Sequence, residues 1–294
     1  MTTMPDNPLC TIDLVTILIT MGEEAPTLLT LNQGQELPSG PLTNRHSLQK
    51  GLHRWAEQHT GCSIGHMEQL YTFADQPLPN TQHQLIRISY LALARITNPD
   101  GFSLQSLYTY FPWEDRRTPA TNSQFKELRT HITSWARHDP ERLTRTIPAF
   151  GLNGLPWDDE KVLDRYELLW EAGLVAKSLP TSTHTSDPSH TPFDNRRILA
   201  TALSRLRAKI RYTPIVFELL PHAFTLLQLQ KAMENLSGRP MHKPNFRRLV
   251  LHQKLVEETG ERDASAPGRP AKLYRFRPEA ATSCYLSGAM LPLD

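Results

Sequence analysis

The segment HKPNFRRLVLHQK, residues 242–254, places cationic and amide side chains at helical spacing. Phe246, Leu249 and Val250 recur at i, i+3 and i+4, which predicts a helix that buries one face. The other face is polar and basic and carries Lys243, Asn245, Arg247 and Arg248. Side chains of these types donate hydrogen bonds to phosphate oxygens and to base edges. The pattern is typical of a recognition helix, although a basic face that only meets solvent would look the same.

A second helix is predicted immediately before this segment. FTLLQLQKAMENLSG, residues 224–238, has an apolar stripe at helical spacing, with Thr225 as the expected N-cap and Gly238 at the expected end. Thr225 can accept a hydrogen bond from a free backbone amide of the first turn, and Gly238 can adopt the left-handed conformation that ends many helices. The two predicted helices are therefore separated only by a short turn.

A hairpin is predicted after the basic helix. KLVEETGERDASAPGRPAKLYRF, residues 254–276, has strand-like ends and a long tip that bears Arg269 and Lys272 beside its glycine. Helix, turn, helix and hairpin in this order describe a winged helix-turn-helix. In such a domain we expect Asn245 and Arg248 to meet base edges, whereas Arg269 and Lys272 would mainly meet phosphates.

Residues 48–61 raise the question of a metal site on a helix. Leu48, Leu52 and Trp55 recur at spacings of four and three, which predicts a helix that Thr60 and Gly61 end. One face of this helix would present Trp55, Gln58 and His59, none of which is a carboxylate. The remaining acid, Glu57, lies about 200° around the helix from Trp55. Because a hard divalent cation needs several oxygen ligands, we expect no metal site and no catalytic residues here.

The rest of the chain supplies the elements that would position these groups. Strands are predicted where β-branched and aromatic residues gather, at residues 10–21, 27–31, 66–75 and 84–95. Helices are predicted at 158–173, capped by Asp158 or Asp159, and at 194–214. The Ser/Thr/Pro tract at 179–192 is interpreted as a linker. We therefore expect a first domain over residues 8–178, with a middle extension at about 104–178, and a second over 193–278.

Charge and composition support this division. Residues 192–278 contain 17 Lys/Arg and 7 Asp/Glu, a net charge of +10, so the other residues carry −8 of the overall +2. A basic domain on an acidic body is expected when one domain binds a polyanion. Three distant cysteines favour neither a disulfide framework nor a zinc site. The sequence has no leader-like N-terminus and no apolar run near the roughly 18 residues of a membrane span, so a cytoplasmic protein is expected.

The segment LPSGPLTNRHSLQKGLHRWAEQHTGCSI resembles a Nudix box, G-x5-E-x7-R-E-U-x-E-E-x-G-U, in which U is a bulky apolar residue. Gly40, Arg54 and Gly61 fall on fixed positions of that pattern, and His46 stands in place of its first glutamate. The three metal-binding glutamates of the helix are replaced by Trp55, Gln58 and His59. The resemblance thus implies a Nudix-like domain that has lost its hydrolase chemistry.

A second resemblance covers the middle and the C-terminal end. FELLPHAFTLLQLQ, KPNFRRLV and GRPAKLYRF resemble the winged-helix domain of the Nudix-related repressors of bacterial NAD biosynthesis. YTYFPWEDRR and WDDEKVLDRYELLWEAGLV are similar to the longer branch of these NAD regulators. The resemblance implies a ligand-responsive transcriptional repressor of NAD biosynthesis or salvage genes, acting as a homodimer on a palindromic DNA operator.

We therefore predict an α/β (α+β) Nudix-like sandwich followed by a winged helix-turn-helix, with no cofactor and no membrane partner. NAD, ADP-ribose or a related adenine nucleotide is the expected effector, and the candidate ligand residues are Arg54, Trp55, Gln58, His59, Tyr71 and Arg87. Trp55 or Tyr71 would stack on the ligand and Arg87 would meet its phosphates. Each also has a structural interpretation, since Trp55 could be a core aromatic and Arg87 could pair with a carboxylate.

Two other classes of protein remain open at this point. One is an active Nudix hydrolase of ADP-ribose or a related dinucleotide, with Glu36, Glu57 or Glu68 in a rearranged metal site. The other is an interaction module that binds no DNA. Hydrolysis requires several converging carboxylates, DNA binding requires the exposed basic helix face, and a protein adaptor requires neither.

Overall fold

The computed structural model describes residues 10–41, 48–61, 64–74, 84–95, 101–175, 195–264 and 270–279. Six strands form one mixed sheet in the order β4-β5-β1-β2-β6, with β3 paired to β1. They are β1 (Cys10–Met21), β2 (Pro26–Thr30), β3 (Ser39–Pro41), β4 (Ile64–Ala74), β5 (Gln84–Ala94) and β6 (Ser103–Ser106). The structure confirms the four predicted strands within two residues at each end. The sequence pattern does not predict β3 and β6, which are the shortest of the six.

Both faces of this sheet are covered, and the sequence of β1 reflects this. β1 and β5 run parallel, while the other strand pairs of the sheet are antiparallel. Side chains alternate along β1, so Ile17 and Ile19 enter one hydrophobic core and Leu14 and Leu18 enter the other. A strand that is buried on both faces is expected to be an almost continuous apolar run, as β1 is.

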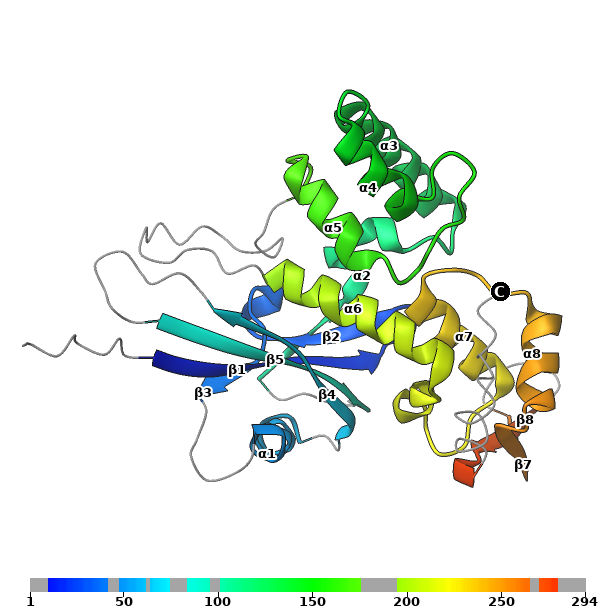
Figure 1. Ribbon diagram of the computed structural model, residues 1–294. Coiled ribbons are helices and arrows are strands. Elements are labelled where there is room, and N and C mark those ends of the chain that lie inside the picture. Colours follow the sequence, from blue (N-terminus) through cyan, green and yellow to red (C-terminus); the bar gives the residue numbers. More distant parts are fainter. Residues whose placement is uncertain are drawn as a thin grey trace, which may run out of the picture.

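One helix lies against each face of the sheet (Figure 1). On one side, α1 (Leu48–Thr60) buries Leu52 and Ala56 in the smaller core. On the other side, α6 (Asn195–Tyr212) buries Leu199 and Leu203 in the larger core, which extends into the C-terminal domain. Helix, sheet and helix form a three-layer α/β/α sandwich, and a short 3-10 helix, η1 (Asn32–Gly34), lies in the β2–β3 loop. The predicted α/β sandwich is therefore confirmed.

A group of helices follows β6 and stands beside the sandwich (Figure 1). Its elements are α2 (Leu107–Tyr110), η2 (Pro112–Glu114), α3 (Pro119–Ala136), α4 (Pro140–Phe150) and α5 (Val162–Glu171). The predicted start of the last helix is wrong. Lys161, not Asp158 or Asp159, is the N-cap of α5, because Asp158 accepts the amide of Glu160 and Asp159 is buried beside arginines. α3 and α4 are not predicted from the sequence.

The C-terminal elements have the arrangement that the sequence predicts. They are η3 (Ile215–Leu219), α7 (Leu226–Ser237), α8 (Lys243–His252), β7 (Val256–Asp263) and β8 (Ala271–Phe276). Thr225 and Gln228 form a reciprocal capping box at the start of α7, and Gly238, with φ of 74°, ends it in the left-handed conformation. These three residues confirm the expected boundaries of α7.

α6 belongs to more than one part of the molecule. It packs on α5, on β4 of the sheet, on η3 and on α7. The domain boundary at residue 193, which assigns α6 to the C-terminal domain, stays a prediction, and the expected linker at 179–192 lies outside the described residues. Across the described ranges, no helix combines the length and apolar character needed to cross a membrane.

Candidate functional site

α8 presents a basic surface to solvent. Phe246 and Val250 are buried beneath the helix, as the periodicity predicts. Lys243, Asn245, Arg247 and Arg248 are exposed, and among the described residues none of them has a hydrogen-bond or ion-pair partner. These four residues are called the α8 surface below. The turn before α8 is fixed, because Glu234 accepts the Met241 amide at 2.8 Å. The α8 surface therefore offers unpaired donors from a rigidly held helix.

The hairpin β7–β8 stands next to α8 and is tied to the start of α7. Phe224 and Tyr274 exchange two backbone hydrogen bonds of 2.9 and 2.8 Å. This hairpin is called the wing below. Within it, Lys272 donates to both carboxylate oxygens of Glu258, at 2.7 and 2.9 Å, so part of the charge of Lys272 is already balanced. Arg269, the other predicted wing cation, lies outside the described residues.

Four of the predicted ligand residues, among them Trp55, belong to α1. Trp55 is partly buried against the smaller core and lies over Gly40, where an added Cβ would be 3.4 Å from the indole Nε1. Arg54 and Gln58 are exposed, and the side chain of His59 is outside the described part of the chain. Arg54, Trp55, Gln58 and His59 are called the α1 surface below. The glycine of the Nudix-like pattern thus leaves room for an aromatic ring at a position that carries a glutamate in that pattern.

The three acids proposed for a rearranged metal site, Glu36, Glu57 and Glu68, do not come together. Glu57 contacts His53 Nδ1 at 3.3 Å and accepts the Ile64 amide at 3.4 Å. Glu68 pairs with Lys209 of α6, and Glu36 is exposed in the loop between β2 and β3. Among the described residues, no three His, Cys, Asp or Glu side chains come together in a way that could hold a metal ion. The residues at the metal positions of the Nudix-like helix therefore do not fit a hard divalent cation.

Tyr71 and Arg87 lie on the opposite face of the sheet from Trp55. In the β4–β5 register Tyr71 pairs with Ser89 and Phe73 with Arg87, and Phe73 packs against the larger core on the α6 side. Tyr71 is 53% exposed, with its ring centroid 4.8 Å from that of Phe73. The structure therefore does not bring the six predicted ligand residues into one site.

A buried ionic cluster, which the sequence reasoning missed, joins the middle helices to α6. Glu114 accepts from Arg165 at 2.6 and 2.9 Å and from Arg207 at 2.5 Å, and all three side chains are at most 1% exposed. Burial alone would raise the pKa of Glu114. The charges and hydrogen bonds of both arginines outweigh burial and hold that pKa below its usual range.

The same cluster holds the end of α7. Arg207 donates from Nε to the carbonyl of Leu236 at 3.0 Å, and the Arg116 amide donates to the carbonyl of Gly238 at 2.7 Å. The hydroxyl of Tyr108 donates to the carbonyl of Asn235 at 2.6 Å. These contacts satisfy carbonyls that the end of a helix leaves free. Glu114, Arg165, Arg207 and the last turn of α7 are called the buried junction below.

Comparisons with known proteins agree with this geometry. Residues 216–276 match the model of the NrtR DNA-binding winged helix domain. An "ADPR responsive transcriptional repressor NtrR" of Acinetobacter baylyi is 42% identical over 84 residues, which make up 29% of this chain and 33% of that protein. The sequence match therefore spans about one third of the curated repressor's length.

Solved structures extend the likeness to the whole fold. Shewanella oneidensis NrtR complexed with a 27mer DNA superposes with a TM-score of 0.55 and 18% identity, over 92% of this chain and 95% of that one. A MutT/nudix family protein from Enterococcus faecalis gives a TM-score of 0.50 and 16% identity, over 93% and 89% of the two chains. At such identities the likeness concerns the fold.

Fold and surfaces together define a two-domain protein, in which a Nudix-like α/β sandwich is joined to a winged helix-turn-helix. The matched domain carries the α8 surface, and the sandwich precedes it in the chain. Residues 216–276 thus form a winged helix domain of the NrtR DNA-binding type, and the chain as a whole has the fold of the solved NrtR structure.

Proposed function

We propose that this protein is a ligand-responsive transcriptional repressor of NAD biosynthesis or salvage genes, acting in the cytoplasm. The observation that carries the proposal is the α8 surface, in a domain of NrtR DNA-binding type. Its cationic and amide groups are exposed and have no partner within the part of the chain that the structure describes. The matched relative is named as a repressor, which supports the same role. A gel shift on promoter regions of NAD-biosynthesis genes, compared with random DNA, tests it.

On DNA, we propose that α8 enters the major groove. Asn245 and Arg248 would meet base edges, since Asn suits adenine and Arg suits guanine. Lys243 and Arg247, with Arg269 and Lys272 of the wing, would meet phosphates. One such module covers little DNA, so we propose a homodimer on a palindromic operator with half-sites about 10 base pairs apart or a multiple of that.

We further propose that the sandwich senses an adenine nucleotide, with ADP-ribose as the first candidate and NAD as the second. The Acinetobacter relative is named as ADPR-responsive. The α1 surface is the proposed site, because it occupies the Nudix-like segment and carries no acid that would repel a diphosphate. Tyr71 and Arg87 are assigned to the other face of the sheet and are not part of this proposed site.

Substitutions of Trp55 and of Arg87, which lie on opposite faces of the sheet, should show which face binds the nucleotide. Calorimetry should detect ADP-ribose binding to the full chain without added metal. Trp55→Ala should weaken that binding by roughly three- to tenfold, because a stacking surface is lost. Arg87→Gln, on the opposite face, should leave it unchanged. Absence of heat at millimolar ADP-ribose and NAD would contradict the sensor proposal, and a loss confined to Arg87→Gln would move the site to the other face.

We infer that the protein has no hydrolase activity. Trp55 and Gln58 offer no carboxylate, and Glu57 is held by His53 and the Ile64 amide. The full chain with Mg²⁺ should therefore hydrolyse neither ADP-ribose nor NAD above a no-enzyme control. Glu57→Gln should leave that background rate unchanged. Turnover of even about 1 s⁻¹, a slow but ordinary enzyme rate, would favour the alternative of an active Nudix hydrolase.

A further inference from the structure

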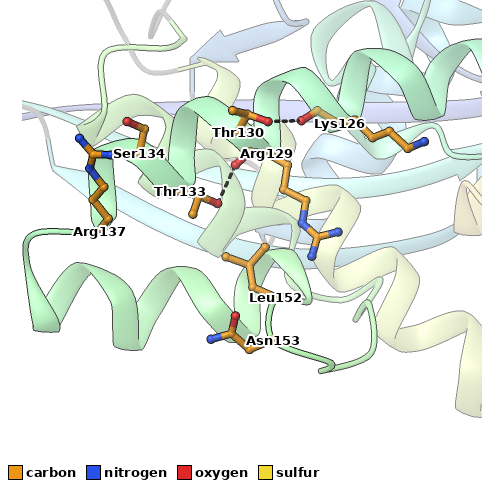
Figure 2. Close-up of a pocket in the computed structure, with 8 residues that line it drawn as sticks. All are labelled: Lys126, Arg129, Thr130, Thr133, Ser134, Arg137, Leu152 and Asn153. Atoms are coloured by element: carbon orange, nitrogen blue, oxygen red, sulfur yellow. Dashed lines mark hydrogen bonds between the residues drawn. The ribbon is translucent and has the colours of Figure 1, made fainter.

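A groove beside α3 gathers basic and hydroxyl side chains away from the sheet. It has a volume of about 640 Å³ and is lined by Lys126, Arg129, Thr130, Thr133, Ser134, Arg137, Leu152 and Asn153. These eight residues are called the α3 groove below. Figure 2 shows Lys126 and Arg137 towards its two ends, with Arg129 and Thr133 on the side of α3 that faces Leu152 and Asn153. The volume is within the range of small-molecule sites.

The cations of the α3 groove differ from those on the neighbouring helix α4. Arg142 and Arg145 have carboxylate partners, at 3.2 Å from Asp139 and 2.5 Å from Glu171. By contrast, Lys126, Arg129 and Arg137 have no carboxylate partner among the described residues. Arg129 donates to the Gly151 carbonyl at 3.3 Å and Arg137 to a His138 ring nitrogen at 2.7 Å, and neither acceptor is a carboxylate.

Another cation lies near the same place. The guanidinium of Arg116 stacks on the rings of Phe125 and Trp157, at 4.7 and 4.5 Å from their centroids. Its pKa is lowered first by burial and then by the charges of Arg165 and Arg129, while the carboxylate of Asp159 acts in the opposite direction. Lys126, Arg129 and Arg137 repel one another, because no carboxylate of the described residues pairs with them, and a bound anion removes that repulsion. The α3 groove is therefore electrostatically suited to an anion.

The hydroxyl groups of the groove limit the kind of anion. Thr130 donates its proton to the carbonyl of Lys126 at 3.0 Å, and Thr133 donates to that of Arg129 at 2.7 Å (Figure 2). Their oxygens keep lone pairs, so they can accept hydrogen bonds from a ligand. A ligand that matches this lining carries phosphate oxygens for the guanidinium groups and hydroxyl donors for the threonines. A phosphorylated sugar has both.

We propose that the α3 groove is a binding site for a phosphorylated sugar or a nucleotide, separate from the α1 surface. Arg129 and Arg137 bind the phosphate, and Thr130 and Thr133 accept from sugar hydroxyls. The apolar side chain of Leu152 lies under the sugar or base. This site goes beyond the proposed sensing of ADP-ribose by the sandwich, and it does not depend on DNA binding.

Calorimetry on the full chain tests this with three probes: ribose 5-phosphate, AMP and inorganic phosphate. The two organic probes should bind, and the double variant Arg129→Gln, Arg137→Gln should raise their dissociation constants by about tenfold or more. Arg145→Gln is the matched control, since it removes an arginine of α4 that already has a carboxylate partner, and it should change nothing. Because Arg129 is half-buried, the exposed single variant Arg137→Gln and a thermal melt distinguish lost binding from lost folding.

The outcomes separate this site from the others. Binding that survives Trp55→Ala and fails in the groove variants supports the α3 groove, even if no operator is bound. Binding that fails in Trp55→Ala and survives in the groove variants overturns it, because the probes then bind at the α1 surface. Equal binding of inorganic phosphate, insensitive to the threonine variants Thr130→Val and Thr133→Val, overturns the sugar assignment. A groove variant that weakens only DNA binding overturns the small-molecule site altogether.

Discussion

Replacing Glu114 by Gln should lower the free energy of unfolding by about 3–5 kcal/mol. Glu114, Arg165 and Arg207 are at most 1% exposed, and the carboxylate receives hydrogen bonds from both guanidinium groups. Gln keeps the shape of the side chain but removes the charge, and so leaves two buried cations without a counter-charge. Urea unfolding of the full chain, followed by circular dichroism, measures the difference.

The matched control is an ion pair of the same type at the surface. Arg145 and Glu171 are 2.5 Å apart, but their side chains are 42% and 34% exposed. Glu171→Gln should therefore cost at most about 1 kcal/mol, because solvent screens exposed pairs. If Glu114→Gln and Glu171→Gln cost the same, the buried junction does not stabilise the protein in the way that its geometry indicates.

At acidic pH, the free energies of unfolding of the wild type and of Glu114→Gln should become more similar. The folded pKa of Glu114 is lowered below its ordinary 4.5, so the carboxylate contributes stability above about that pH. As the pH falls below 4.5 towards the folded pKa, this contribution is lost and the two proteins should approach each other in stability. Asp159, whose pKa burial raises, is present in both proteins and cancels in the comparison.

The buried junction also explains how the winged helix is held against the rest of the chain. Arg207 of α6 binds Glu114 and the carbonyl of Leu236, while Lys209, two residues further along α6, pairs with Glu68 of β4. One helix thus contacts the sheet on one side and the end of α7 on the other. The larger hydrophobic core is continuous across the same region. The domains are therefore joined by packing and charge as well as by the chain itself.

The sequence predicted those elements whose formation depends on residues close together in the chain. The apolar run of β1, the cap at Thr225 and the end at Gly238 each depend on neighbours within a few residues. The buried side of α8 follows from the spacing of Phe246 and Val250 in the same way. Such features need no knowledge of the rest of the fold.

Features that depend on distant contacts were not predicted. Glu114 is 51 residues from Arg165 and 93 from Arg207, and charged side chains are expected at the surface unless a partner is known. The separation of Arg87 from Trp55 was missed for another reason. Alternation along β5 groups Arg87 with Ser89 and Leu91, but it does not indicate which face of the sheet α1 covers.

The second large effect concerns DNA, where Arg248→Ala should cost roughly 1 to 3 kcal/mol of operator binding and relax specificity at one base. Arg248 is two residues from both Phe246 and Val250, so it lies about 200° around the helix from the buried side chains, at the centre of the exposed face. A guanidinium in that position can make a bidentate contact with guanine. Gel shifts on promoter regions of NAD-biosynthesis genes and on random DNA, at several salt concentrations, measure the change.

Lys272 of the wing provides the matched comparison for Arg248, because we expect it to contact phosphates and not bases. Lys272→Ala should weaken binding to all sequences alike and reduce the slope of log affinity against log salt by about one unit. Glu258→Gln should act in the opposite direction, since it frees the ammonium that Glu258 now holds at 2.7 and 2.9 Å. If the protein recognises its operator, Arg248→Ala should reduce the preference for promoter DNA over random DNA, and both wing variants should keep that preference. The repressor proposal would be wrong if the protein bound promoter and random DNA with equal affinity and none of the three substitutions changed that affinity. The net positive charge of the domain would then be the remaining observation in favour of DNA binding.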